Sequence, residues 1–164
     1  MNEIRFYKEF GPLGYLATYS NHGFYKDNIY WKTSEHYYQA QKFSDPVVKQ
    51  LIIDAPTPKE ASNIGRNRMY HLREDWELIK QQVMFEAVYF KFKQNEQILK
   101  KLLETGDAYI VEATVKENYW GCGPNNDGQN NYGKIVMAVR LKLKTEYKGE
   151  IHHEKRTDFE SWLS

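Results

Sequence analysis

The strongest constraint on the fold is a long segment whose apolar residues recur at intervals of three and four. These residues are Trp76, Ile79, Val83, Ala87 and Phe90. The spacing is that of one buried face of an α-helix, because 3.6 residues complete each turn. The segment therefore predicts a long helix that begins at Asp75 and ends near Gln94, with this face in the core.

Start and stop signals predict three shorter helices before this one. Thr33 or Ser34 can cap a helix that ends near Asp45, because the residue before a proline avoids the α region. A second helix follows over residues 46–53. A third begins in residues 57–60, where a threonine cap precedes a proline and a glutamate lies three residues after the cap.

Two helices are predicted after the long one, with an extended loop between them. Asn95 caps a helix that Gly106 ends. Residues 134–147 form the last helix, although the alternation in residues 139–143 also fits a strand. Residues 114–134 form a Gly/Asn-rich loop, and a loop of that length in a compact domain is usually functional or disordered.

Clear β signals occur only in residues 1–32, where short aromatic runs are separated by Gly, Asn and Asp. Asp27-Asn28 between two such runs predicts a hairpin. Residues 107–113 fit no element clearly. We expect a mainly α, compact single-domain fold with a small antiparallel β element near the N-terminus. The domain covers residues 1–147, and a C-terminal tail of residues 148–164 packs on it or extends it.

Composition narrows the class of protein. The 23 Lys and Arg residues nearly balance the 22 Asp and Glu residues, so the net charge of +1 creates no general attraction to nucleic acid or membrane. The single cysteine, Cys122, excludes an intramolecular disulfide and a Cys-based zinc cluster. The N-terminus lacks the apolar core of a signal peptide, and no apolar run approaches ~20 residues. We therefore expect a cytoplasmic protein without membrane association, metal or cofactor.

The first predicted helix carries an unusual set of polar groups between its aromatic residues. Glu35, Gln39 and Lys42 lie at positions i, i+4 and i+7, so they project from one face of a helix. A carboxylate, an amide and an ammonium on one face can bind a polar ligand and supply an acid or base. The alternative is a solvated face with a weak ion pair.

Other candidate residues lie further along the chain. Trp76 fits the buried stripe of the long helix, so it is either a core residue or part of a site. Trp120 lies in the Gly-rich loop, where Gly121 lets a ligand approach the backbone. Glu117, three residues earlier, is either a surface carboxylate or a second acid of the site. Arg66 belongs to a compact basic patch that can meet a phosphate or be ordinary surface.

Several short blocks are characteristic of one family. They are, in chain order, Ser34–Phe43, Ile64–Arg66, Arg73–Trp76, Val83-Met84 with Lys91-Phe92, Leu102–Gly106, Val111–Ala113, Tyr119–Gly121 and Asn131–Lys134. Together they resemble the NADAR (YbiA-like) family over about residues 4–143. The resemblance implies a compact helical domain that hydrolyses N-glycosidic bonds. YbiA-like members cleave ribosylamino-pyrimidine phosphates of riboflavin synthesis, and other members remove ADP-ribose from guanine bases in nucleic acid.

The resemblance also implies site residues: Glu35, Trp76, Glu117 and Trp120 match residues implicated in YbiA-like enzymes. Two departures stand out. The family typically has Asp where this chain has Glu117, and the segment 16–19 reads Leu-Ala-Thr-Tyr where a Leu-Ser-Asn-Phe-like string is common. The second departure can alter the rim of the pocket or the preference for a base.

These observations give one main hypothesis. The protein is an N-glycosidase that acts on ribosylamino-pyrimidine phosphates, with no metal and no cofactor. The alternatives are a hydrolase that removes ADP-ribose from guanine in DNA or RNA, so that nucleic acid is a partner only as modified substrate, and a non-catalytic ADP-ribose-binding module. The expected catalytic residues are Glu35, Glu117 and Lys42, and the expected substrate-binding residues are Trp76, Trp120, Gly121, Gln39 and Arg66.

Two chemical roles follow for the residues of the first helix. Cleavage of a C–N glycosidic bond places positive charge on the sugar C1′, which Glu35 can stabilise, or Glu35 can activate water. The amine of Lys42 can instead form a Schiff base with a ring-opened sugar, which requires a depressed pKa.

Overall fold

The computed structural model describes residues 2–163, with side chains up to residue 148. Its elements, in chain order, are β1 (Glu3–Phe6), a 3-10 turn (Gly14–Leu16), β2 (Phe24–Lys26), β3 (Ile29–Trp31), α1 (Ser34–Ala40), α2 (Pro46–Asp54), α3 (Pro58–Arg66), α4 (Trp76–Gln94), α5 (Glu96–Glu104), β4 (Tyr109–Glu112) and α6 (Asn131–Leu163). The mainly α class predicted from the sequence is confirmed.

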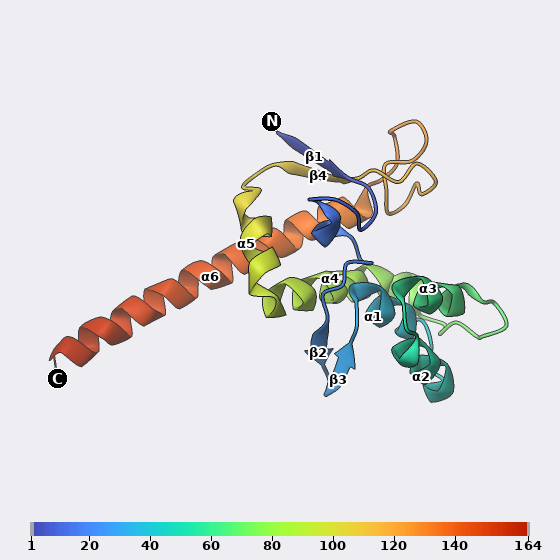
Figure 1. Cartoon of the computed structure of the whole chain (residues 1–164), viewed down its shortest axis with the longest axis horizontal. Helices are drawn as coiled ribbons and strands as arrows, with labels where there is room; N and C mark the ends of the chain where they lie inside the picture. The colour runs from blue at the N-terminus through green and yellow to red at the C-terminus, as the bar shows by residue number, and fades with distance from the viewer. Residues whose placement is uncertain (1, 164) are drawn as a thin grey trace.

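Helix α4 lies at the centre of the molecule, with α1 and α6 packed against it (Figure 1). The predicted buried face is present, because Trp76, Val83 and Ala87 are all buried. The contact with α1 includes a hydrogen bond, since the hydroxyl of Ser34 donates to the carbonyl oxygen of Ala87 at 2.6 Å. Helix α1 is therefore held on the core by the element that the sequence predicts most clearly.

Two small sheets flank the helices. The predicted hairpin pairs β2 with β3, and Asp27 and Asn28 at its turn have φ of 54° and 62°. The second sheet pairs β1 with β4 in parallel, so that Phe6 lies opposite Glu112 (Figure 1). This second sheet was not predicted, because a parallel pair joins segments far apart in sequence and leaves no local turn signal.

Two predicted helix boundaries and one predicted side-chain cap are wrong. Helix α1 ends at Ala40 rather than near Asp45, because Lys42 and Phe43 make tight i→i+3 hydrogen bonds that close the helix early. The side chain of Asn95 does not cap α5; it donates to the carbonyl oxygens of Gly23 and Lys91 instead. Helix α6 begins at Asn131, three residues before the predicted start.

Helix α6 continues through residues 148–163 as one helix, so the expected tail extends an element of the domain. Figure 1 shows its C-terminal part running away from the other elements. Among the described residues, no helix combines the length and the apolar character that crossing a bilayer requires.

Candidate active site

The carboxylate of Glu35 is buried and held by two donors. Thr33 caps α1 by accepting from the backbone N–H of His36, which places Glu35 in the first helical turn. One carboxylate oxygen accepts from the Thr18 hydroxyl at 2.8 Å, and the other accepts from the Gln39 amide nitrogen at 2.7 Å. With only 6% of its surface exposed, Glu35 has little rotamer freedom.

Gln39 lies between Glu35 and helix α3. Its amide nitrogen donates to Glu35, which directs the Oε1 atom toward Gly65 of α3. A Cβ atom at Gly65 would lie 2.0 Å from this oxygen, so only glycine lets α1 and α3 approach so closely. The Oε1 atom is buried and has no hydrogen-bond partner within the described part of the chain. Gln39 therefore holds the Glu35 carboxylate in place and is itself packed against α3.

Lys42 is buried without a hydrogen-bonding partner for its amine. No hydrogen bond or ion pair to a carboxylate reaches Nζ from any residue that the structure describes. The atom lies 5.4 Å from the ring centre of Tyr38 and 6.0 Å from that of Trp76. Burial is the largest cause that lowers the pKa of the Lys42 amine to about 8, and the charge of Glu35 opposes this change.

Positive groups surround this amine. The charges of Arg68, Arg66 and Lys80 lower the pKa of Lys42 further. Arg66 is exposed at the end of α3, and the guanidinium of Arg68 donates to the carbonyl oxygen of Gly65 at 3.2 Å. Three positive charges therefore act on this amine, although the whole chain carries a net charge of only +1.

Aromatic rings join the three predicted site segments. Tyr38 of α1 makes edge contacts with Trp76, at 5.2 Å between ring centres, and with Trp120, at 5.9 Å. Trp76 is only 5% exposed, so it is a core residue and a neighbour of Lys42 at once. The ring of Trp120 is partly exposed and is also in contact with Tyr119. Trp76 has the core position that the buried stripe predicts, because α4 begins with its side chain against α1.

The carboxylate of Glu117 is directed at its own loop. Its Oε1 atom accepts from the backbone N–H groups of Tyr119, at 2.9 Å, and Trp120, at 3.2 Å. These bonds fix the loop that presents Trp120. Gly121 follows in a crowded position, where a Cβ would lie within 3.0 Å of Glu112, of Thr114 and of the Glu117 backbone. The structure thus gives Glu117 a structural contact rather than a free carboxylate.

Sequence reasoning missed three residues near Glu35. Thr18 lies in the segment 16–19 that departs from the family string. The sequence therefore marked this segment as unusual but did not show that Thr18 contacts Glu35. Tyr38 belongs to a helix full of aromatic residues, and nothing local marks it as the contact between two tryptophans. Glu112 ends β4, an element that the sequence does not define.

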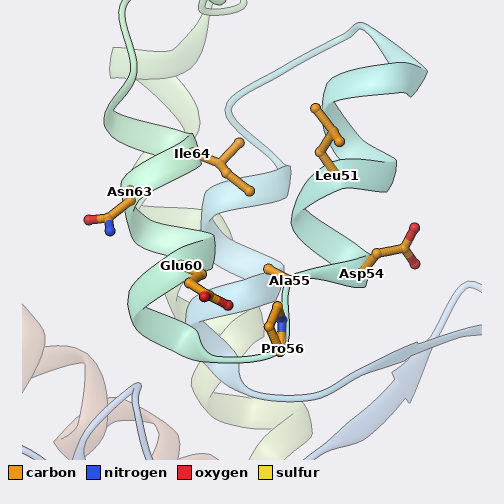
Figure 2. Close-up of a pocket in the computed structure, with 7 residues that line it drawn as sticks. All are labelled: Leu51, Asp54, Ala55, Pro56, Glu60, Asn63 and Ile64. Carbon is orange, nitrogen blue, oxygen red and sulfur yellow. The ribbon is translucent and has the colours of Figure 1, made fainter.

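Two hollows in the surface lie outside this cluster of candidate residues. One of about 440 Å³ lies between α2 and α3, lined by Leu51 and Ile64 among others, and contains none of the candidate residues (Figure 2). The other, of about 470 Å³, includes Tyr19 and Ser20 in its lining. Because Tyr19 follows Thr18, this second hollow lies beside the group that holds Glu35.

Fold and site together define a compact helical domain with a fixed carboxylate and an unpaired amine between aromatic rings. Such a site suits a polar ligand that carries a flat ring. The model of the NADAR domain matches residues 5–144, so the chain belongs to the NADAR family.

Similar proteins agree with this assignment. An N-glycosidase of Nostoc punctiforme is 44% identical over 144 residues, which cover 86% of this chain and 92% of that protein. The N-glycosidase YbiA of Escherichia coli is 37% identical over 143 residues, or 87% of this chain and 89% of that protein. The solved structure of E. coli YbiA matches with a TM-score of 0.83 over 89% of this chain and 87% of that chain. The predicted family and fold class are therefore confirmed.

A further relative is a longer protein. The chain is 36% identical over 140 residues, or 85% of its length, to a riboflavin biosynthesis protein of Vibrio vulnificus, but the match covers only 38% of that protein. The names of these relatives agree with the enzyme class that the sequence predicts.

Proposed function

We propose that this protein is an N-glycosidase that hydrolyses the bond between ribose C1′ and the amino nitrogen of a ribosylamino-pyrimidine phosphate. The observation that carries the proposal is a pair of groups in one site. The Glu35 carboxylate is fixed by Thr18 and Gln39, and the buried Lys42 amine is available for chemistry. Relatives named N-glycosidases and a relative named for riboflavin biosynthesis support the reaction and the substrate class.

Glu35 acts on the sugar in this proposal. Breaking the C1′–N bond leaves positive charge on C1′, and a carboxylate that is already oriented stabilises this charge without reorganising. The two hydrogen bonds of Glu35 hold it in that orientation. Loss of such a group typically costs on the order of a hundredfold or more in rate.

Lys42 has two available roles. In one, its ammonium positions the substrate. In the other, the neutral amine attacks the C1′ imine of the ring-opened ribosylamine, the aminopyrimidine leaves with a proton, and water then hydrolyses the new imine to free sugar and lysine. A pKa of about 8 leaves about one amine in ten neutral at pH 7, far more than for an ordinary lysine. Reductive trapping with borohydride separates these roles, because only the second forms a reducible bond.

The remaining residues bind the two ends of the substrate. Trp120 and Trp76 offer ring faces and edges to the pyrimidine, and Gly121 lets it approach the loop backbone. Arg66 binds the phosphate, in the positive field that it shares with Arg68 and Lys80. Glu117 acts through Trp120, by fixing the loop.

The test uses purified protein with two substrates: a ribosylamino-pyrimidine phosphate and DNA that carries ADP-ribose on guanine. We expect release of ribose 5-phosphate from the first, measured by chromatography. Release of ADP-ribose from the second alone would favour the other hydrolase activity of the family. Binding of ADP-ribose without release from either substrate, by a folded protein, would contradict the enzyme proposal and favour a binding module.

A further inference from the structure

Glu112 is a carboxyl group near the candidate site to which the proposed function gives no role. It is the last residue of β4, and its backbone is fixed on both sides. The Glu112 N–H donates to the side-chain oxygen of Asn130, and its carbonyl oxygen accepts from the N–H of Cys122, both at 2.9 Å. The backbone that carries this side chain is therefore anchored to the loop of Trp120 and to the start of α6.

The side chain of Glu112 has one occupied oxygen and one open oxygen. The Thr114 hydroxyl donates to Oε1. Oε2 faces Gly121, where a Cβ atom would lie 2.8 Å from it, and it accepts no hydrogen bond from the part of the chain that the structure describes. The residue is only partly buried, so this oxygen can meet a ligand. Gly121 follows Trp120, and Trp120 contacts Tyr38 one helical turn beyond Glu35.

Two carboxylates act on Glu112 and favour its neutral form: Glu117 in the loop after β4, and Glu35 in α1. Tyr132 of α6 is a third titratable neighbour, and its raised pKa keeps it a neutral phenol. Burial is the largest cause that raises the pKa of the Glu112 carboxyl group; the Thr114 hydrogen bond opposes it, and the two carboxylates add to it. Tyr132 offers no compensation, because it is buried and its hydroxyl donates to the carbonyl oxygen of Leu16.

We propose that Glu112 is the general acid of the glycosidase, and that its Oε2 donates a proton to the nitrogen of the departing aminopyrimidine. This inference rests on the proposed function. As the C1′–N bond breaks, its electron pair stays on nitrogen, which takes the proton of Glu112. The hydroxide part of a water molecule joins C1′, and the other proton of that water passes to Glu35. Exchange with solvent then returns Glu35 to the carboxylate and Glu112 to the acid.

The two acids then have different tasks because their surroundings differ. Glu35 receives hydrogen bonds on both oxygens, as a carboxylate prefers, whereas Glu112 receives one and faces two negative groups. The surroundings of Glu112 thus suit a carboxyl group that holds a proton, which is the state that a general acid requires. Glu117 is assigned to the loop instead, because its Oε1 atom accepts from the backbone N–H groups of Tyr119 and Trp120.

The experiment measures kcat and KM against pH for the wild type, Glu112→Gln and Glu112→Asp. Gln keeps an acceptor for Thr114 but has no acidic proton. We expect Glu112→Gln to lower kcat at least about 100-fold with KM within about threefold, and to remove the fall in kcat at high pH. Glu112→Asp keeps that fall and recovers part of the rate. Glu96→Gln, an exposed change on α5, is the control and leaves both parameters unchanged.

Two results would overturn the assignment in an active enzyme: a kcat of Glu112→Gln near that of the wild type, or a lower kcat with the high-pH fall intact. A second measurement does not need turnover. In ¹³C NMR of labelled glutamate side chains, with Glu112→Gln to assign the signal, we expect the Glu112 carboxyl group to titrate at higher pH than an ordinary glutamate. An ordinary glutamate titration overturns the proposal, whereas an inactive wild type with a raised titration contradicts only the proposed N-glycosidase function.

Discussion

Two buried lysines, Lys42 and Lys91, share burial and a lowered pKa but differ in what their amines contact. Burial lowers the pKa of Lys42 to about 8 and that of Lys91 to about 7. The Lys91 ammonium donates to the carbonyl oxygens of Tyr15 and Ala17, at 2.6 and 3.0 Å, and to the Ser20 hydroxyl at 3.0 Å. The contacts of the Lys42 amine within the described part of the chain are with the rings of Tyr38 and Trp76.

On this difference we propose a structural role for Lys91 and a functional role for Lys42. The three bonds of Lys91 use all the donors of an ammonium group and fasten the segment 15–20, which carries Thr18 to Glu35. The donors of Lys42 are unused by the described residues, so they are available to a ligand. A depressed pKa is common to both lysines, and we base the proposed role of Lys42 on these available donors.

The largest expected effect comes from Lys42→Met. We expect kcat to fall by about 1000-fold, because the amine is lost from the reaction. We also expect the free energy of unfolding to stay the same or rise by about 1 kcal/mol, since an unpaired buried charge is replaced by an apolar chain. Steady-state kinetics and urea unfolding measure both. A kcat of Lys42→Met near the wild-type value would contradict the functional role proposed for Lys42.

Lys91→Met is the matched substitution, and its expected effect is on stability. The Tyr15 carbonyl oxygen and the Ser20 hydroxyl lose the Lys91 donor, and the Ala17 carbonyl oxygen keeps the N–H of Ser20. The free energy of unfolding should therefore fall by about 3 kcal/mol. The kcat of the folded fraction should change by less than about tenfold, because Lys91 reaches Glu35 only through the segment 15–20. A variant as stable as the wild type in urea would contradict the structural role.

The same lysine gives stability a pH dependence with a definite sign. The pKa of Lys91 in the folded protein, about 7, lies below its value in the unfolded chain, so the unfolded chain binds more protons between these values. Unfolding free energy should therefore rise as the pH rises from about 7 toward 10.5, and Lys42 contributes in the same direction from about 8. In Lys91→Met this rise should shrink.

Gly65→Ala should have a smaller effect than either lysine substitution. It displaces Gln39 and leaves both lysines unchanged. The added Cβ would overlap Gln39 Oε1, so the amide must move and loosen its bond to Glu35. We expect kcat to fall about tenfold and the unfolding free energy to fall by about 1–3 kcal/mol. Ala61→Gly on the same helix controls for general loosening of α3; an equal loss of kcat there would show that the Gln39 contact is not the cause.

The part of the fold that could be predicted from the sequence is the part that leaves local signals, such as helix caps and helical spacing. Thr57 before Pro58 predicts the start of α3, and Thr57 does accept from the N–H of Glu60. Glu35 and Gln39, four residues apart, were expected on one face, and they are hydrogen-bonded. Contacts within one helix follow from its period, so sequence reasoning reaches them.

The rest depends on contacts between distant segments. The parallel pairing of β1 with β4 and the bond between Thr18 and Glu35 join residues with no local relation. The direction of the Glu117 carboxylate follows from the path of its loop, which the sequence pattern does not define. The roles of Glu35, Lys42, Trp76 and Trp120 stay predictions, because their positions agree with a shared site but do not measure chemistry.

The central claim is that the fixed carboxylate of Glu35 drives cleavage of the C1′–N bond. The most direct test is the rate of ribose 5-phosphate release from a ribosylamino-pyrimidine phosphate by Glu35→Gln, with exposed Glu60→Gln of α3 as the matched control. We predict a loss of at least about 100-fold in kcat for Glu35→Gln, with substrate binding retained, and no change for the control. Equal rates for Glu35→Gln and the wild type would contradict the account.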